Sequence, residues 1–345
     1  MKKIALILVF ITASLALYSF VSSEDTTKDP MYGWAISKIS WKEIPQPADN
    51  PITKEKVDLG AMLFFDPRLS NSNTMSCATC HDPNKGYSDG IPFFKGDHGI
   101  MGPRRTPTII NLAWNSTFFW DGRAESLEEQ SLMPISADGE MRQDMVALKK
   151  ELEEAGYVPY FKKAFGSKAV INNDYIARAI AAFERTLVSH NSPFDRYMSG
   201  DKKALTEAQI RGKKIFETKA ECTTCHSGPN FTDGSFHNLG IDTQDEGRFK
   251  HVPVAVNKFA FKTPGLRDIE HRAPYFHNGS AKTLREVMEI YNRGGDASSV
   301  TQGNVEIKPL GLTDQEMDDV VEFMKGLSGK GAHALKSPKL PGIKH

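Results

Sequence analysis

The four cysteines of this chain stand in two copies of one short pattern. In each copy two residues separate the cysteines, and a histidine directly follows the second cysteine. The residues are Cys77, Cys80 and His81 in the first copy, and Cys222, Cys225 and His226 in the second. Two thiols at this spacing can bond to the two vinyl groups of one porphyrin, and the histidine can then bind its iron. Because the two copies use every cysteine, we expect two covalently bound haem c groups, one in each half of the chain.

Paired cysteines can also form disulfides, bind zinc or act as a redox dithiol. Disulfides suit an exported protein. A structural zinc ion needs four protein ligands, so each set of two cysteines and one histidine would have to be completed from elsewhere. A redox dithiol does not need a histidine after its second cysteine. The repetition of the whole pattern favours haem over these three.

The N-terminus predicts export. Lys2 and Lys3 precede an apolar run over residues 4–21, and small or polar residues follow at 22–24. This order is typical of a secretory signal. The run is about as long as a short membrane span, so an uncleaved anchor is the alternative. We therefore expect residues 1–23 to be a signal peptide or an N-terminal anchor, and the protein to be periplasmic.

Length and charge limit the class of protein. The 345 residues are enough for two domains. Lys plus Arg and Asp plus Glu both number 43, so the net charge is close to zero. This balance argues against nucleic acid as a partner, although a locally charged docking face for a redox protein remains compatible with it.

The two cysteine patterns have similar surroundings. Residues 59–65 and 211–216 resemble each other ahead of the patterns, and Gly-rich stretches follow at 86–90 and 231–234. Such a weak internal repeat predicts two cytochrome c-like domains.

Helical patterns dominate the rest of the chain, so the expected fold is all-α with long ordered loops. We expect helices over 145–155, 175–188, 283–291 and 317–327, and from Thr206 onward. The expected long loops cover 91–107 and 228–262. With a boundary near 191–203, the expected parts are an N-terminal domain over 24–195, a C-terminal domain over 196–330 and a flexible tail over 331–345.

Several short motifs occur in a fixed order around the two patterns. Arg-Arg-Thr-Pro-Thr at 104–108 precedes Phe-Phe-Trp-Asp-Gly at 118–122, and Ala-Pro-Tyr-Phe-His-Asn-Gly stands at 273–279. This ordered set resembles the bacterial di-haem cytochrome c peroxidase family, which includes the MauG-type enzymes. The resemblance extends from about residue 59 to 327.

The resemblance implies a division of labour between the haems. Peroxide would react at the low-potential haem on His81, and electrons would enter at the high-potential haem on His226. Trp120 matches the tryptophan that lies between the haems in the family.

The resemblance also implies a catalytic pocket at the N-terminal haem. Glu140 matches the distal acid, which moves a proton between the two peroxide oxygens. Gln130 and Pro134 match further residues of the same pocket.

Two sixth-ligand positions are left open by the resemblance. His98 lies near the position of a histidine that family peroxidases place over the N-terminal iron and release when the other haem is reduced. MauG-type proteins lack that ligand. At the C-terminal iron the position of the usual methionine reads Tyr291, as in MauG-type proteins, and Met288 is a competing ligand one helical turn earlier. A phenolate should lower the haem potential, whereas methionine raises it.

The calcium site of the family is altered. Arg105 and Arg272 stand where the family has an Asn and a Thr that bind the ion, while Pro274 is retained. A guanidinium repels a hard cation that prefers oxygen ligands. Calcium binding is therefore doubtful, and an arginine could replace its charge.

Three functions follow from these observations. The leading hypothesis is an oxidoreductase that reduces hydrogen peroxide with electrons from a small cytochrome c or cupredoxin. The second is a MauG-type enzyme that oxidises residues of a partner protein through a high-valent di-haem state. The third is a di-haem electron carrier, against which Glu140, Gln130 and Trp120 argue because a carrier needs no peroxide pocket. The family often forms homodimers, and the sequence does not decide whether this chain does.

Overall fold

The computed structural model describes residues 28–29, 33–34, 42–241, 244–295, 305–330 and 335–343. The predicted signal peptide or anchor over 1–23 lies outside these residues. Within the described part of the chain, no helix has both the length and the apolar character needed to cross a bilayer.

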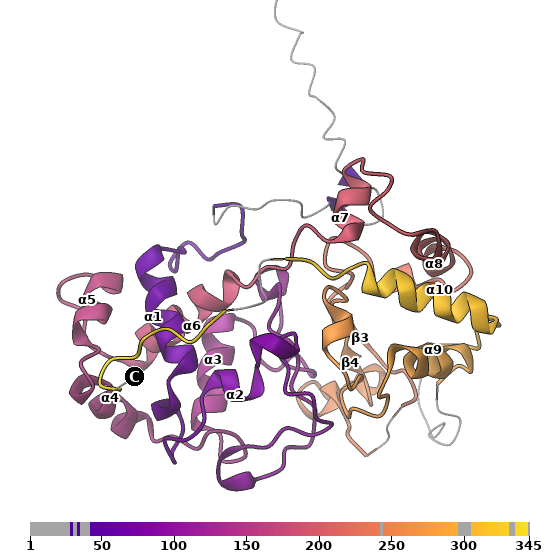
Figure 1. The fold of residues 1–345 in the computed structure, drawn as a ribbon. Coiled ribbons are helices and arrows are strands. Elements are labelled where there is room, and N and C mark those ends of the chain that lie inside the picture. Colours follow the sequence, from indigo (N-terminus) through magenta and orange to yellow (C-terminus); the bar gives the residue numbers. More distant parts are fainter. Residues whose placement is uncertain are drawn as a thin grey trace, which may run out of the picture.

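The chain forms two helical halves that lie side by side (Figure 1). The first half contains α1 (Lys54–Phe65), α2 (Cys77–Cys80), α3 (Leu127–Ser136), α4 (Met145–Glu154), α5 (Val158–Phe165) and α6 (Asn173–Arg185). The second contains α7 (Pro193–Met198), α8 (Glu207–Glu217), α9 (Leu284–Asn292) and α10 (Asp314–Lys325). The two described sheets are two-residue antiparallel pairs, β1 (Lys28–Asp29) with β2 (Gly33–Trp34) and β3 (Phe236–His237) with β4 (Phe261–Lys262). The all-α prediction is therefore confirmed.

Short 3-10 turns lie in the segments between the helices. They are η1 (Pro67–Leu69), η2 (Pro83–Lys85), η3 (Asp97–Gly99), η4 (Leu112–Trp114), η5 (Cys222–Thr224), η6 (Arg248–Lys250), η7 (Ala255–Asn257) and η8 (Ile269–His271).

The helix starts follow the capping residues of the sequence. Thr283 and Thr313 accept hydrogen bonds through their side chains from the backbone amides of Glu286 and Glu316, at 3.1 and 3.3 Å. Such bonds satisfy amides that have no partner within the helix. They fix the starts of α9 and α10 one residue after each threonine.

Each half is built on one crossed helix pair, α1 with α6 and α8 with α10. A Cβ atom added at Gly60 would collide with the carbonyl oxygen of Ala179, and one at Gly212 would collide with that of Asp319. The glycines therefore allow the helix backbones to touch. Next to each glycine a phenylalanine pair packs with ring centroids 5.2 Å apart, Phe64 with Phe183 and Phe216 with Phe323.

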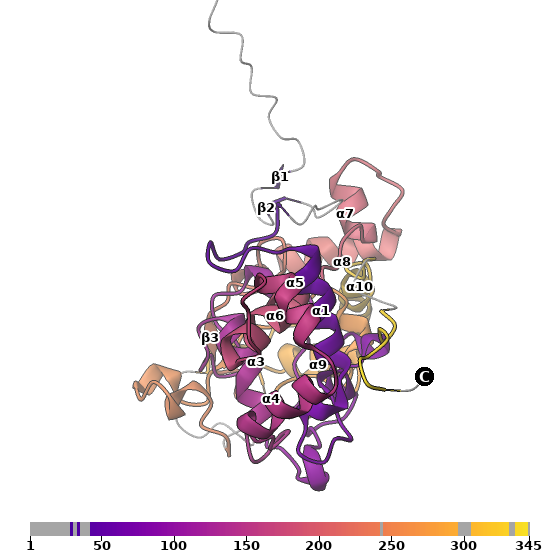
Figure 2. The ribbon, with the colours of Figure 1, turned by 90° about the vertical axis from the view of Figure 1, so that its left-hand side faces the viewer.

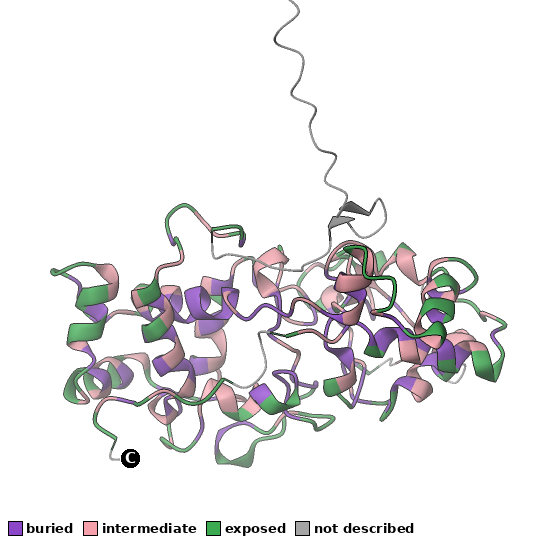
Figure 3. Cartoon of the chain, turned by 45° about the horizontal axis from the view of Figure 1, so that its top comes forward, coloured by how far each residue is buried: buried purple, intermediate pink, exposed green. Residues whose placement is uncertain are grey.

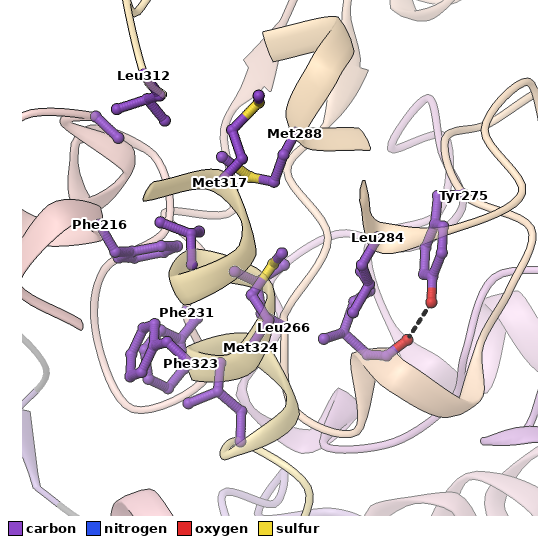
Figure 4. Close-up of a cluster of buried hydrophobic side chains, with 14 of the residues drawn as sticks. Phe216, Phe231, Leu266, Tyr275, Leu284, Met288, Leu312, Met317, Phe323 and Met324 are labelled. Carbon is purple, nitrogen blue, oxygen red and sulfur yellow. Dashed lines mark hydrogen bonds between the residues drawn. The ribbon is translucent and has the colours of Figure 1, made fainter. Parts of the chain in front are cut away.

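The core of the second half surrounds this helix pair. Figure 4 shows Phe216, Phe231 and Phe323 packed on one side, and Met288 close to Met317 on α10. Figure 3 shows buried residues in both halves, with exposed residues on the outer turns and loops.

The expected boundary over 191–203 contains the short helix α7. Its Phe194 is buried in the core of the second half, and Asp195 is buried beside it. Gly200 follows the helix with a φ of 106°. The structure thus attaches α7 to the second half, while the domain limits themselves stay a prediction.

The C-terminal segment differs from the flexible tail expected over 331–345. Its described part, residues 335–343, leaves α10 and runs along the first half (Figures 1 and 2). Leu340 is buried in the core cluster of that half, and the carbonyl oxygen of Pro341 accepts a hydrogen bond from Arg68 at 2.8 Å. The apolar Leu340 is the reason that this stretch is held in place.

Candidate active site

A single cavity of about 890 Å³ joins the two cysteine patterns. Cys77, Cys80 and His81 line it from the first half, and Cys222, Cys225 and His226 line it from the second. Residues that are 145 positions apart in the sequence therefore open onto one space.

The two histidines are held in the same way. The Nδ1 atom of His81 lies 3.1 Å from the carbonyl oxygen of Tyr87, and that of His226 lies 2.9 Å from the carbonyl oxygen of Phe231. A proton on Nδ1 leaves Nε2 free to bind a metal, and the hydrogen bond fixes the ring. Burial lowers the pKa of both imidazoles, which favours the neutral form that a metal requires.

The four cysteines carry free thiols. Burial raises the pKa of Cys80 and of Cys222 to about 12 each. Neutral, buried thiols next to a large cavity are poor nucleophiles toward solvent. They suit a permanent covalent partner in that cavity.

Glu140, Gln130 and Pro134 line the cavity on the side of the first half. Burial raises the pKa of the Glu140 carboxyl, and the guanidinium of Arg123 acts in the opposite direction. The Oε1 atom of Gln130 is buried and has no hydrogen-bond partner in the described part of the chain. A buried polar atom of this kind requires a partner from a bound molecule.

Pro134 lies within α3, four residues after Gln130. Proline has no backbone amide to donate, so the helical bond from position 134 to the carbonyl oxygen of Gln130 is missing. The structure brings these two residues and Glu140 together, as the motif order implied.

Trp120 is almost buried, at 9 % exposure, and lines the same cavity. Its indole nitrogen donates to the carbonyl oxygen of Arg105 at 2.9 Å, and its own carbonyl oxygen accepts from the amide of Lys262 at 2.8 Å. Its ring also meets His277 edge to face, with centroids 6.4 Å apart. Trp120 is therefore packed between the two halves of the chain.

His98 does not line the cavity. Its side chain is 52 % exposed, and Nε2 lies 3.6 Å from the carboxylate of Asp97. Asp97 is buried and accepts from the amide of Ser72 at 2.9 Å, which anchors the turn. In this conformation the imidazole lies outside the cavity that Glu140 and Gln130 line.

Both candidate ligands for the second iron line the cavity. Burial raises the pKa of the Tyr291 phenol, and the neighbouring sulfur atoms of Cys222 and Cys225 add to the shift. Met288 is 3 % exposed and belongs to the hydrophobic core beside Met317 (Figure 4). Tyr291 thus lies close to the second cysteine pair, whereas Met288 also packs in the core of the second half.

The two halves repeat the same local structure around the cavity. Phe118 pairs with Ala124 and Tyr275 with Ala281 in equivalent bridges, and Phe119 and Phe276 both have a φ of 66°. The helices α3 and α9 start three residues after these bridges. Counted from them, Pro134 and Tyr291 occupy equivalent positions.

The family models match both halves of the chain. A model described as di-haem cytochrome c peroxidase matches residues 54–203, and a cytochrome c model matches residues 209–328. The methylamine utilization protein MauG of Methylorubrum extorquens is 44 % identical over 304 residues, which cover 87 % of this chain and 85 % of that protein.

The chain belongs to the di-haem cytochrome c peroxidase family.

Other relatives of this haem oxidoreductase family agree with the assignment. Cytochrome c551 peroxidase of Pseudomonas aeruginosa is 34 % identical over 318 residues, covering 89 % of this chain and 88 % of that protein. A solved MauG-like protein associated with microbial copper homeostasis has a TM-score of 0.79 and 31 % identity, and the match covers 86 % of this chain and 96 % of that one. The chain is thus an enzyme of a family that contains both peroxidases and MauG proteins.

The residues present fit the two haem c groups that the family implies. Both thiol pairs and both oriented imidazoles open onto the cavity, and the unpartnered Oε1 of Gln130 lies at its edge. We therefore take the cavity as the haem site of this di-haem protein.

Glu184 on α6 is a cavity residue that the sequence did not reveal. It is 4 % exposed, its Oε2 atom has no hydrogen-bond partner in the described structure, and burial raises its pKa to about 8. The packing of Gly60 on Ala179 and of Gly212 on Asp319 makes Glu184 equivalent to Met324 of α10. Aligning the two helix pairs at these contacts places Glu184 opposite Met324, which would have identified the carboxyl as a candidate.

Proposed function

We propose that this enzyme reduces hydrogen peroxide to two waters in the pocket lined by Glu140 and Gln130. Two electrons and two protons complete the reaction. The electrons would enter through the His226 haem from a small donor such as a cytochrome c or a cupredoxin. The observation that carries the proposal is the half-buried Glu140 carboxyl, which lines the same cavity as His81 and has a raised pKa.

The haem on His81 would supply an iron that binds peroxide and exchanges electrons with it. The protein would supply the proton transfer. A carboxyl with a raised pKa holds a proton more readily than an ordinary carboxyl, so Glu140 can take a proton from one peroxide oxygen and give it to the other. Gln130 would orient the oxygen atoms through its free Oε1 or its amide group.

The exposed position of His98 supports an N-terminal site that is open in the fully oxidised protein. Moving His98 into the cavity would require breaking the bonds of the neighbouring turn, including the 2.7 Å bond from the Asp97 amide to the Glu140 carbonyl oxygen. We therefore propose that turnover needs no prior reduction to remove a histidine ligand.

Trp120 would couple the two sites. Its ring lines the shared cavity, and its backbone and indole are bonded to residues on both sides of it. A packed indole at this place gives an electron a short path through bonded contacts.

The proposal is tested by peroxide turnover with reduced cytochrome c as donor. The fully oxidised protein and a sample first reduced by one electron should oxidise the donor at similar rates. Glu140→Gln should lose most of this activity in both samples, while the Glu153→Gln control on the exposed face of α4 keeps it. Turnover that survives in Glu140→Gln would exclude the proposed proton transfer.

A second function is favoured by Tyr291, whose phenol opens onto the cavity next to Cys222 and Cys225. A phenolate on the second iron lowers its potential and stabilises the oxidised states of the pair. This would suit a MauG-type enzyme that draws electrons from residues of a partner protein. Negligible donor oxidation, together with a long-lived peroxide-induced spectrum, would establish this function in place of the first.

We also propose a periplasmic location. The basic start, the apolar run over 4–21 and the covalent attachment of haem c together support it. Amino-terminal sequencing of the protein purified from a periplasmic fraction tests it, because a cleaved signal predicts a start near residue 24.

A further inference from the structure

Buried arginines in this protein fall into two groups. In the described part of the chain five arginines are buried, namely Arg104, Arg105, Arg185, Arg267 and Arg272. Three of them form ion pairs: Arg104 with Asp121 and Asp245, Arg185 with Glu128, and Arg267 with Asp195. The other two, Arg105 and Arg272, form no ion pair with a carboxylate of the described chain.

Arg105 is 5 % exposed and Arg272 is 3 % exposed. The Nε atom of each has no hydrogen-bond partner in the described structure. Burial lowers the pKa of each guanidinium to about 10. Both groups therefore stay charged at neutral pH. Asp89 raises the pKa of Arg105 and Asp268 raises that of Arg272, but neither carboxylate forms an ion pair with its arginine in the described structure. A buried charge without a paired counter-ion is unfavourable.

Both arginines line the shared haem cavity, and they come from its two sides. Arg105 donates through its guanidinium to the carbonyl oxygen of Arg272 and, at 3.0 Å, to the hydroxyl of Ser88. Arg272 donates to the carbonyl oxygen of Gly265 at 2.8 Å. These bonds satisfy some N–H groups and fix the guanidinium planes, while they leave the positive charge unbalanced.

We propose that Arg105 and Arg272 form one carboxylate-binding site, and that haem propionates are its occupants. Guanidinium groups bind carboxylates through charge-assisted and often bidentate hydrogen bonds. Both side chains line the cavity bounded by the two haem-attachment patterns. Propionates are the carboxylates that a haem brings into that space, so the cofactor itself would supply the missing negative charge.

This site would also take the place of a calcium ion between the halves. Two fixed guanidinium groups repel a divalent cation, and their charge can hold the propionates without one. The inference rests on haem attachment alone and does not depend on whether the enzyme is a peroxidase or of the MauG type.

The first test is the metal content of the purified holoprotein. We expect no stoichiometric calcium, and we expect the haem spectrum and the reduction potentials to stay the same after treatment with a calcium chelator. One calcium ion per chain, with a spectrum that changes when the ion is removed, would overturn the proposal. This measurement uses the unaltered protein and needs no variant to fold.

The second test measures the reduction potential of each haem in Arg105→Gln and Arg272→Gln. Loss of a cation next to a propionate favours the ferric state, so at least one haem should become about tenfold harder to reduce, which equals about 59 mV for one electron. Arg105→Lys should leave the haem reduction potentials close to those of the unaltered protein, because lysine keeps the positive charge. Lys150→Gln, which removes an exposed charge on α4, is the control for net charge. Potentials in both Gln variants that match this control would overturn the proposal.

A free anion could satisfy the same chemistry, and added phosphate separates the two sources. Propionates are part of the cofactor, so the potentials of the unaltered protein should not change with phosphate concentration at constant ionic strength. Potentials that follow phosphate in the unaltered protein, but not in Arg105→Gln, would show that a free anion occupies the site and would overturn the assignment to propionates.

Discussion

The two halves of this enzyme share one frame and differ in what they present to the cavity. Both have a helix pair crossing at a glycine, a phenylalanine pair at 5.2 Å and a histidine fixed through Nδ1. At equivalent positions the first half has Pro134 and Glu184, where the second half has Tyr291 and Met324.

Under the proposed function, this difference would separate substrate binding from electron entry. Proline has no side-chain group that can bind iron, and the carboxyl of Glu140 lies nearby, so the first half can accept a small polar substrate. The second half presents a phenol, a thioether and the phenylalanine-rich core shown in Figure 4. The same fold therefore serves two purposes through a few side chains around each haem.

The largest expected effect comes from removing the Glu140 carboxyl of the first half. Glu140→Gln should lower peroxide turnover by about 10²–10⁴-fold, the usual contribution of general acid–base catalysis. Reduction of the second haem by the donor should keep its rate. Stopped-flow measurement of both steps checks this, and a slowed electron entry would show that the two halves are not divided in this way.

The second prediction concerns the phenol of the other half. Tyr291→Met should raise the potential of the C-terminal haem by on the order of 0.1 V or more, within the roughly 0.8 V range that axial ligands set. The potential of the N-terminal haem should change far less. Spectroelectrochemistry checks this, with Met288→Leu as the matched control one turn earlier on α9. A larger shift in the control would make Met288 the ligand.

The shared frame is tested by equal changes in both halves. Gly60→Ala and Gly212→Ala each force a methyl group against a helix backbone and should cost about 1–3 kcal/mol of stability. Chemical unfolding followed by circular dichroism checks this, with Gly139→Ala as the control because no atom lies within 4 Å of a Cβ added there. Unequal costs for the first two variants would argue against a true repeat.

A smaller effect is expected from the carboxyl of Glu184. Its pKa of about 8 lies above the ordinary value of 4.5, so the folded protein keeps a proton that the unfolded chain releases between these values. Stability should therefore fall as the pH rises from about 5 to 8. Glu184→Gln should remove most of this dependence, because glutamine does not titrate. The equivalent Met324→Leu should keep the pH dependence of the parent protein.

The smallest effect is expected at His98. Because its side chain is exposed and outside the cavity, His98→Ala should change turnover by less than about twofold and should leave both haem spectra unchanged. A variant that becomes active without prior reduction, from a parent that needs it, would show that His98 is a displaceable ligand after all.

Much of the haem site and of the repeat could be predicted from the sequence because both depend on short local motifs. The two cysteine patterns predicted the haem sites, and the similarity of residues 59–65 to 211–216 predicted the repeat. Glu140, Gln130, Pro134 and Trp120 followed from the order of motifs, and the structure brings all four to the cavity.

What the sequence did not reveal depends on tertiary contacts. Glu184 lies in an ordinary amphipathic helix, and only the crossing of α6 over α1 turns it toward the cavity. Leu340 lies in a stretch rich in Lys, Gly and Pro, where one apolar residue gives no periodic signal. That the Nε atoms of Arg105 and Arg272 have no hydrogen-bond partner in the described structure can be known only when their neighbours in space are known.

The most direct test of the divided roles is an electron paramagnetic resonance titration of the fully ferric protein with cyanide. We expect one haem signal to shift at low cyanide concentration. We expect Tyr291→Met to change only the other signal. Two signals that both resist cyanide, or one signal that responds to both treatments, would contradict an open first half and a closed second half.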